Sequence, residues 1–292
     1  MRKRVQIAVA VLFVALVSAI VWDGLRSHER EPVYQGKRLS VWLKSFDLST
    51  PKEEADLAAD AVRHIGTNAL PVLLEMICSK DRDSRWESLL AWINHRQSLV
   101  HLPVQPGLAR RTRAASAFHA LGASAKSAVP ALNQALFNNP DNTEASLALV
   151  VIGPEAMPSV MQGTTNNDPR IRAAAVRTLG GMSFDADAVV PVLIKSLKDD
   201  SGEVRFSAAF SLGEFPQESA AIVPALTESL ADRDDKVRRS ALYSLGLLGR
   251  EARMASPLIQ HALDDPSKSV RFAAAKALKN IDPEAAAKAG VE

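Results

Sequence analysis

Four segments of the sequence align with one another and decide the fold: PRIRAAAVRTLGG (169–181), GEVRFSAAFSLGE (202–214), DKVRRSALYSLGL (235–247) and KSVRFAAAKALKN (268–280). Corresponding residues of consecutive segments lie 33 positions apart. This interval separates the arginines Arg172, Arg205, Arg238 and Arg271, the prolines Pro158, Pro191, Pro224 and Pro257, and the aspartates Asp199, Asp232 and Asp265. One period held at several independent positions indicates an array of stacked repeats.

Each repeat carries the signals of two helices joined by a turn. At the N-cap, before the alanine-rich run, stands a residue whose side-chain oxygen accepts a hydrogen bond from a free backbone N–H: Asp168, Ser201, Asp234 or Ser267. We expect Gly180, Gly213 and Gly246 to end the first helices in the left-handed conformation that glycine adopts cheaply. The periodic prolines are expected at the start of the second helices, where a missing N–H costs nothing.

The composition favours helices and sets limits on the partners. Hydrophobic residues make up 47% of the 292 residues but aromatic residues only 5%, so the apolar content is mostly Ala, Leu and Val. Apart from Arg2, Lys3 and Arg4, the 35 basic residues fall to 32, against 33 acidic ones. Such a balance argues against a nucleic-acid partner, which requires a basic stripe. Cys78 is the only cysteine, so no intramolecular disulfide can form.

The pattern D-x-x-x-x-V-R-x-A-A-x-x-L-G, followed by P-x-L-x-x-x-L, resembles the HEAT repeat in its short, phycobilisome-lyase-like form. The resemblance covers roughly residues 53–289 and implies an all-α fold, a right-handed α-solenoid of helical hairpins. It also implies that the periodic arginines and aspartates form a structural ladder between repeats, rather than an anion-binding site. The pattern weakens upstream, where Asn166 replaces the aspartate and Glu144 stands at the place of an arginine.

Three parts are expected along the chain. Residues 1–22 form a membrane anchor or signal peptide, and residues 23–52 form a linker and a short amphipathic helix around 39–46. Residues 53–292 form the solenoid of about six hairpins, with an insert at 84–107 that contains Trp86 and Trp92. The insert is either a site for a partner or for anionic lipid, or an ordinary helical insertion whose tryptophans cover the first hairpin.

The N-terminal segment from Val5 to Trp22 contains only Gln6 and Ser18 as polar residues and follows a basic cluster. As a helix it is about 27 Å long, against a hydrocarbon core of roughly 30 Å. It is therefore a single membrane anchor through residues 5–22, or a signal peptide cleaved near Ala19. Either way the solenoid is expected on the periplasmic side, tethered to the membrane or released from it. With these features the chain resembles uncharacterised exported or membrane-anchored bacterial HEAT-repeat proteins.

Candidate binding residues are those that vary while the repeat frame is kept. In the second helices they form three columns: Ile194, Thr227 and Gln260; Lys195, Glu228 and His261; Lys198 and Asp264, with Ala231 between them. We expect these columns on the concave surface that solenoids use for binding. Their mixed charges suit one irregular protein surface.

The favoured function is a non-catalytic scaffold that binds a protein partner. The sequence shows no Ser/His/Asp signature, metal-ligand spacing, P-loop or dinucleotide motif, so no catalytic residue, cofactor, metal or small-molecule substrate is inferred. The alternative, suggested by the lyase-like form of the repeat, is a bilin-lyase-like or chaperone-like enzyme.

Overall fold

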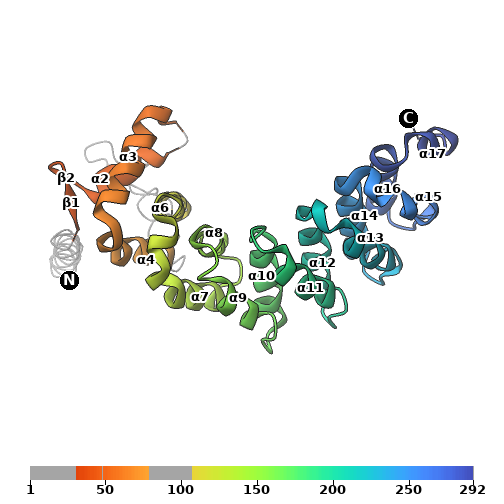
Figure 1. Cartoon of the computed structure of the whole chain (residues 1–292), viewed down its shortest axis with the longest axis horizontal. Coiled ribbons are helices and arrows are strands. Elements are labelled where there is room, and N and C mark those ends of the chain that lie inside the picture. Colours follow the sequence, from red (N-terminus) through yellow and green to blue (C-terminus); the bar gives the residue numbers. More distant parts are fainter. Residues whose placement is uncertain (1–30, 48, 79–106, 292) are drawn as a thin grey trace, which may run out of the picture.

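The computed structural model describes residues 31–47, 49–78 and 107–291, and these residues fold into stacked helical hairpins (Figure 1). The first helices of the repeats are α3 (Lys52–Ile65), α6 (Gly107–Leu121), α8 (Thr143–Ile152), α10 (Pro169–Gly180), α12 (Gly202–Ser211), α14 (Asp235–Leu248) and α16 (Lys268–Ile281). The second helices are α4 (Leu70–Cys78), α7 (Val129–Asn138), α9 (Met157–Gly163), α11 (Ala186–Ser196), α13 (Ser219–Glu228), α15 (Ser256–His261) and α17 (Pro283–Lys288). Within the described ranges, six hairpins are followed by the pair α16 and α17, as the period predicts.

A small structure precedes the first hairpin and differs from the linker that we expected there. Strands β1 (Val33–Tyr34) and β2 (Lys37–Arg38) form an antiparallel hairpin, followed by α2 (Leu39–Leu43) and a 3₁₀ turn at Lys44–Phe46. The indole N–H of Trp42 donates to the Tyr34 carbonyl oxygen at 3.2 Å. The short predicted helix is present, and the strands before it are held by this tryptophan.

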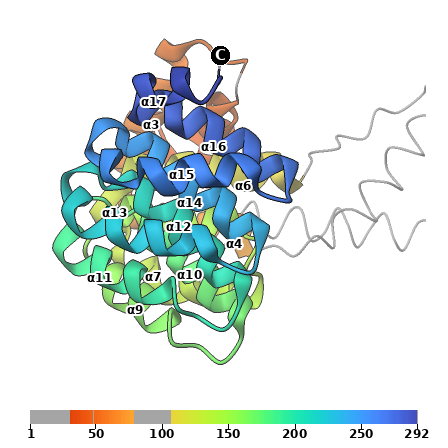
Figure 2. The ribbon, with the colours of Figure 1, turned by 90° about the vertical axis from the view of Figure 1, so that its right-hand side faces the viewer.

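The hydrophobic core runs as one cluster along the stack, from Leu39 to Ala286. In Figure 2, α10, α12 and α14 lie on one side of the stack and α11 and α13 lie on the other. Buried apolar residues of both layers belong to this cluster. Neighbouring first helices pack closely, above all α14 with α16 and α10 with α12, whereas neighbouring second helices make few contacts. The small residues of the first helices permit this approach, since alanine and glycine add little bulk to the helix surface.

Gly180, Gly213 and Gly246 serve this close packing, so the left-handed role predicted for them is wrong. None of the three has a positive φ. A Cβ on Gly180 would lie 2.3 Å from the Ser211 Oγ, and one on Gly246 would lie 3.2 Å from the Ala277 Cα. The left-handed position belongs to other glycines, such as Gly249 after α14, with a φ of 60°.

The ends of the helices follow the sequence signals in part. Asp168, Ser201, Asp234 and Ser267 are the N-caps of α10, α12, α14 and α16, and the two aspartates accept a backbone hydrogen bond with their side chains. Pro158 and Pro257 lie in the first turn of α9 and α15. Pro191 and Pro224 instead lie inside α11 and α13. In α11 the Asp185 side chain accepts a hydrogen bond from the Ala188 backbone N–H. This N-cap starts the helix several residues earlier than predicted, so Pro191 lies within it.

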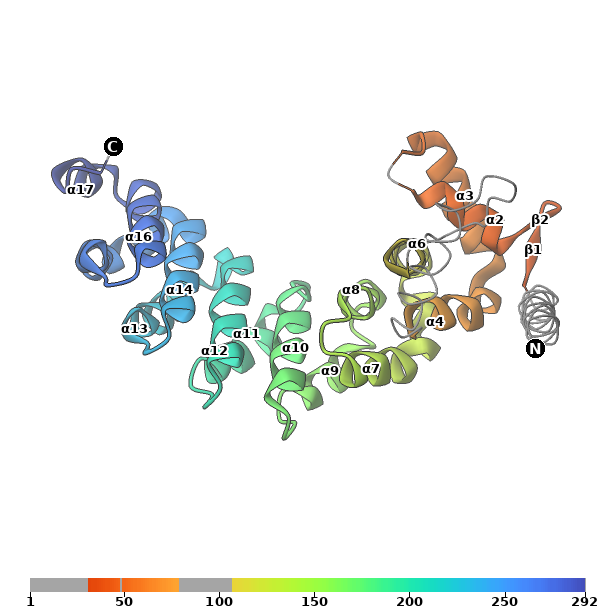
Figure 3. The same cartoon turned by 180° about the vertical axis from the view of Figure 1, so that it is seen from behind.

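The stack follows an arc. In Figures 1 and 3, α6, α8, α14 and α16 lie toward its inner side, while α4, α7 and α13 lie toward its outer side. Among the described residues, no helix combines the length and the apolar character needed to cross a bilayer. The predicted anchor at 5–22 and the insert with Trp86 and Trp92 fall outside the described residues, so both remain predictions.

Candidate partner-binding surface

The periodic arginines and aspartates are joined in a ladder along the stack. Arg172 binds Asp199 through its Nε and Nη2 at 2.8 and 2.7 Å. Arg205 binds Asp232 in the same way at 2.7 and 2.9 Å, and Arg238 binds Asp265 at 2.8 and 2.9 Å. In each of these three pairs the two charges neutralise one another. Neither side chain of a pair is therefore available to bind an anionic ligand.

Each ladder arginine also fixes the turn before its own helix. The Nη1 of Arg205 donates to the backbone carbonyl oxygen of Asp199 at 2.9 Å, and Arg238 does the same to Asp232 at 2.8 Å. Burial by itself raises the pKa of Asp232, but hydrogen bonds from Arg205 and from the Asp234 backbone N–H outweigh it and leave this pKa below its ordinary value. The hydrogen bonds from Arg238 likewise lower the pKa of Asp265. The aspartates are therefore stable as carboxylates.

The last repeat departs from this scheme. The Nη1 of Arg271 donates to the carbonyl oxygens of Asp265 and Pro266 at 2.7 and 3.0 Å, as in the interior repeats. No aspartate within the described ranges pairs with its Nε and Nη2. The glycine column also ends in this repeat, because the residue 33 positions after Gly246 is the exposed Lys279. The predicted ladder thus comprises three ion pairs, with Arg271 as an end member.

The predicted binding columns lie on the second-helix side of the stack. Ile194, Lys195 and Lys198 come together at a groove of about 470 Å³ between α11 and α13. Lys198 lies 3.9 Å from Glu228, and both side chains are exposed. Thr227 donates to the Val223 carbonyl oxygen at 2.6 Å and is partly buried. Gln260, His261 and Asp264 are exposed on α15 and the turn after it, outside this groove.

The position of these columns in the arc differs from the expectation. We placed them on the inner face, whereas α13, which carries Thr227 and Glu228, lies toward the outer side in Figures 1 and 3. The first helices α6, α8, α14 and α16 lie toward the inner side in those views, whereas α10 and α11, in the middle of the arc, lie side by side in Figure 2. Which layer lies inside depends on the relative spacing of the two layers, and a pattern within one repeat does not encode it. The partner-binding role of the columns stays a prediction.

The first helices carry an aromatic surface that the sequence argument missed. Four large side chains remain exposed on three consecutive first helices: Phe210 at 42%, Tyr243 at 43%, Leu247 at 48% and Phe272 at 75%. The rings of Phe210 on α12 and Tyr243 on α14 stack in parallel, with centroids 5.6 Å apart and an interplanar angle of 4°. Together with the half-buried Phe206, these residues are called the aromatic surface below.

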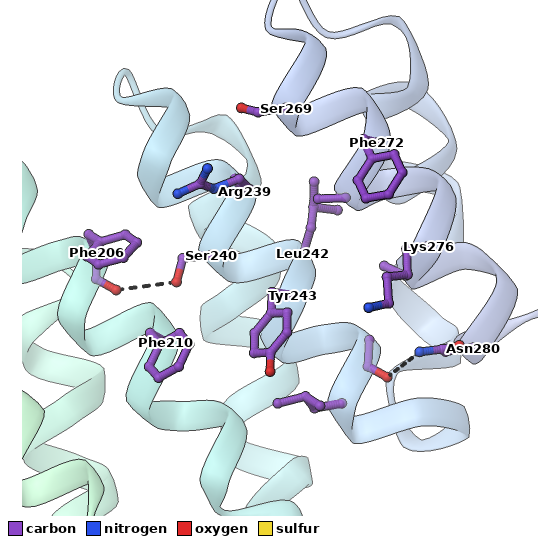
Figure 4. Close-up of a pocket in the computed structure, with 14 residues that line it drawn as sticks. Phe206, Phe210, Arg239, Ser240, Leu242, Tyr243, Ser269, Phe272, Lys276 and Asn280 are labelled. Carbon is purple, nitrogen blue, oxygen red and sulfur yellow. Dashed lines mark hydrogen bonds between the residues drawn. The ribbon is translucent and has the colours of Figure 1, made fainter.

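A groove of about 480 Å³ opens along this surface (Figure 4). Tyr243 and Leu247 from α14 line one wall, Phe272 from α16 lines the other, and Phe206 and Phe210 extend the surface onto α12. Leu242 lies at the floor between α14 and α16 and is fully buried. A volume of this size is typical of a site that receives a side chain or a small apolar group.

Hydrogen bonds between the helices hold the walls of the groove in place. The Asn280 side-chain amide donates to the Gly246 carbonyl oxygen at 3.3 Å, which ties α16 to α14. The Ser240 hydroxyl donates to the Phe206 carbonyl oxygen at 3.4 Å, and the Ser244 hydroxyl donates to that of Ala209 at 2.7 Å. The helices that present the aromatic side chains are thus fixed before any partner arrives.

A signal for this surface was present in the sequence. Two columns of the first helices vary while the frame is kept: Ala173, Phe206, Arg239 and Phe272, and Arg177, Phe210, Tyr243 and Lys276. The same test for variation that we applied to the second helices finds them. Four of the few aromatic residues of the chain fall in these two columns. Columns that hold aromatic residues in some repeats and charged residues in others indicate an exposed face, because a close-packed interface would not accept both.

Comparison with known proteins agrees with this architecture. A sequence profile described as HEAT repeats matches residues 157–246 and 223–289. No curated protein matches the sequence.

Three solved structures are among those that resemble parts of the chain. The complex of CpcE and CpcF of phycocyanin lyase from Nostoc sp. PCC7120 is 26% identical, with a TM-score of 0.47, over 52% of this chain and 98% of that one. Human deoxyhypusine hydroxylase is 18% identical, with a TM-score of 0.37, over 84% and 96%. A designed armadillo repeat protein is 18% identical, with a TM-score of 0.38, over 56% and 88%. At these scores the likenesses do not bear on activity. The stacked hairpins form a helical solenoid, and residues 157–289 of it match the HEAT-repeat profile.

Proposed function

We propose that the chain is a non-catalytic scaffold and that its aromatic surface binds a partner protein. HEAT-like solenoids present extended surfaces of this kind for binding. The observation that carries the proposal is the exposure of Phe210, Tyr243, Leu247 and Phe272 on neighbouring first helices, where all four line or border one groove. A contiguous exposed apolar patch on a soluble domain marks an interaction site.

The residue types of the surface also support a protein partner. Aromatic side chains are enriched at protein interfaces, and those with the largest effect on affinity fill pockets near the centre of an interface. The stacked Phe210 and Tyr243 rings are already ordered, so binding costs little side-chain entropy there. The two serine hydrogen bonds beneath them keep the backbone of α12 and α14 in register.

The lining of the groove favours a scaffold over the lyase-like alternative. Its polar side chains are Arg239, Ser240, Ser269, Lys276 and Asn280. No carboxylate, histidine or cysteine lines it, so it offers no carboxylate or imidazole for acid–base chemistry and no thiol nucleophile. The groove is therefore better suited to recognition than to chemistry.

The experiment is quantitative capture of cross-linked partners by the full chain in its native host. We expect Tyr243→Ala with Phe272→Ala to reduce the capture of the main partner at least tenfold, at an unchanged melting temperature. The matched control is Lys195→Glu with Asp264→Lys on the second helices, which should leave capture intact. The reverse pattern would assign binding to the predicted columns, and no effect of the aromatic pair would end the proposal.

The place of action is proposed from the sequence. The apolar segment 5–22 with its basic flank supports a tether at the membrane, with the solenoid outside the cytoplasm. A tethered scaffold would hold its partner close to the membrane surface.

A further inference from the structure

The groove on α14 and α16 is flanked by two positive charges. Arg239 extends from α14 toward Phe206, and Lys276 extends from α16 toward Tyr243 (Figure 4). Both side chains are exposed. No acidic residue lines the groove, and within the described part of the chain neither cation makes a salt bridge.

Two ladder arginines near the groove differ from these two cations because they form ion pairs. Arg238, the neighbour of Arg239 on α14, binds Asp265, and Arg205 on α12 binds Asp232. The ladder thus uses the nearby carboxylates Asp232 and Asp265 internally. The charge of Arg239 and Lys276 is left uncompensated next to an apolar surface, where a carboxylate from outside would be attracted most strongly.

From this charge complementarity we propose that the groove binds an acidic segment of the partner protein. One aromatic or aliphatic side chain of the segment enters between Tyr243 and Phe272, and flanking carboxylates reach Arg239 and Lys276. The proposal rests on the protein-binding function proposed above and adds the chemistry of the partner. It also adds an axis along which the segment lies, because the two cations are on either side of Tyr243 and Phe272. Arg239 lies toward α12, while Lys276 lies on α16.

Two other classes of ligand fit the observations less well. Single-stranded nucleic acid would stack bases on the rings, but it also needs a basic groove that follows many phosphates. The surface offers two free cations on a chain whose charges nearly cancel. An anionic bilayer would likewise favour a cluster of several cations over two. An acidic peptide needs only an apolar groove and a few cations beside it, and this surface has both.

The test is selection of peptides from a random dodecapeptide display library on the immobilised full-length chain, followed by fluorescence anisotropy of the selected peptides. We expect Asp and Glu to be enriched beside Phe, Tyr, Trp or Leu. Arg239→Glu with Lys276→Glu should weaken these peptides at least tenfold, and Phe272→Ala should do the same. Lys195→Glu with Lys198→Glu, which reverses an equal charge on the second helices, should change the affinity less than twofold. Affinity should fall with added salt, because exposed charges are screened.

The possible failures are separable. Selected peptides that lack acidic residues, or that bind the charge-reversed variant equally well, would overturn the acidic partner; dependence on Phe272 would still support the aromatic surface. Peptides insensitive to Phe272→Ala would overturn both proposals. Binding of labelled oligo(dT), or of phosphatidylglycerol vesicles, that exceeds peptide binding and is lost in Arg239→Glu with Lys276→Glu would overturn the acidic partner in favour of that ligand.

Discussion

Arg205 on α12 binds Asp232 of the following repeat with two parallel hydrogen bonds, although 27 residues separate them. The two side chains are only 8% and 11% exposed. A third hydrogen bond from the same guanidinium group holds the turn that precedes its own helix. One side chain therefore fixes both the turn within a repeat and the distance to the next repeat, which explains why the period is so regular.

The ladder should matter most where it is complete. Arg205→Ala leaves the largely buried Asp232 carboxylate without its partner, and we expect a loss of about 3 kcal/mol in unfolding free energy. Arg271→Ala is the matched control, because Arg271 has the same backbone bonds but no aspartate in the described part of the chain. Urea unfolding measures both. Equal losses would show that the ion pair itself contributes little.

The ladder should also make stability depend on pH in the acid range. The pKa of Asp232 is lower in the folded chain than its ordinary value near 4. Its contribution is therefore complete above that ordinary value and is lost as the pH falls through the folded-state pKa. We expect Asp232→Asn to be clearly less stable than the unmodified chain at pH 7 and to approach its stability near pH 2. A difference in urea midpoint that stays constant over this range would contradict the assignment.

Gly180 should be irreplaceable because Ser211 occupies the space of a side chain. Gly180→Ala would place a Cβ 2.3 Å from the Ser211 Oγ and 2.5 Å from its Cβ, and we expect a loss of about 1–3 kcal/mol. A second change, Ser211→Gly, should recover part of that loss, which a double-mutant cycle detects. The absence of coupling between the two positions would contradict the role of Gly180 in close packing against Ser211.

The proposed location is tested by a reporter. A phosphatase that folds only outside the cytoplasm, fused after Glu292, should be active if residues 5–22 send the solenoid across the membrane. Deletion of residues 1–22 should abolish the activity. A fusion that is active only as a cytoplasmic reporter would contradict this topology.

The period of the sequence predicted the repeat, the hairpins and the N-caps, because each of these depends on residues close together in the chain. The role of Gly180 was misjudged because glycine serves both a positive φ and a close approach, and only the partner Ser211, 31 positions away, distinguishes them. Pro191 was misplaced because Asp185 starts α11 earlier. The aromatic surface was missed because variation was sought only in the second helices, which were expected to lie inside the arc.

The most direct test of the account is photo-cross-linking from single positions of the full chain. A benzophenone side chain would be placed at Phe272 on the aromatic surface, and in a second variant at His261 on the neighbouring second helix; both positions are exposed. We predict that one partner protein is cross-linked from position 272 and that the yield from position 261 is at least tenfold lower. Cross-linking mainly from position 261, with none from position 272, would contradict the claim that the first helices form the binding surface.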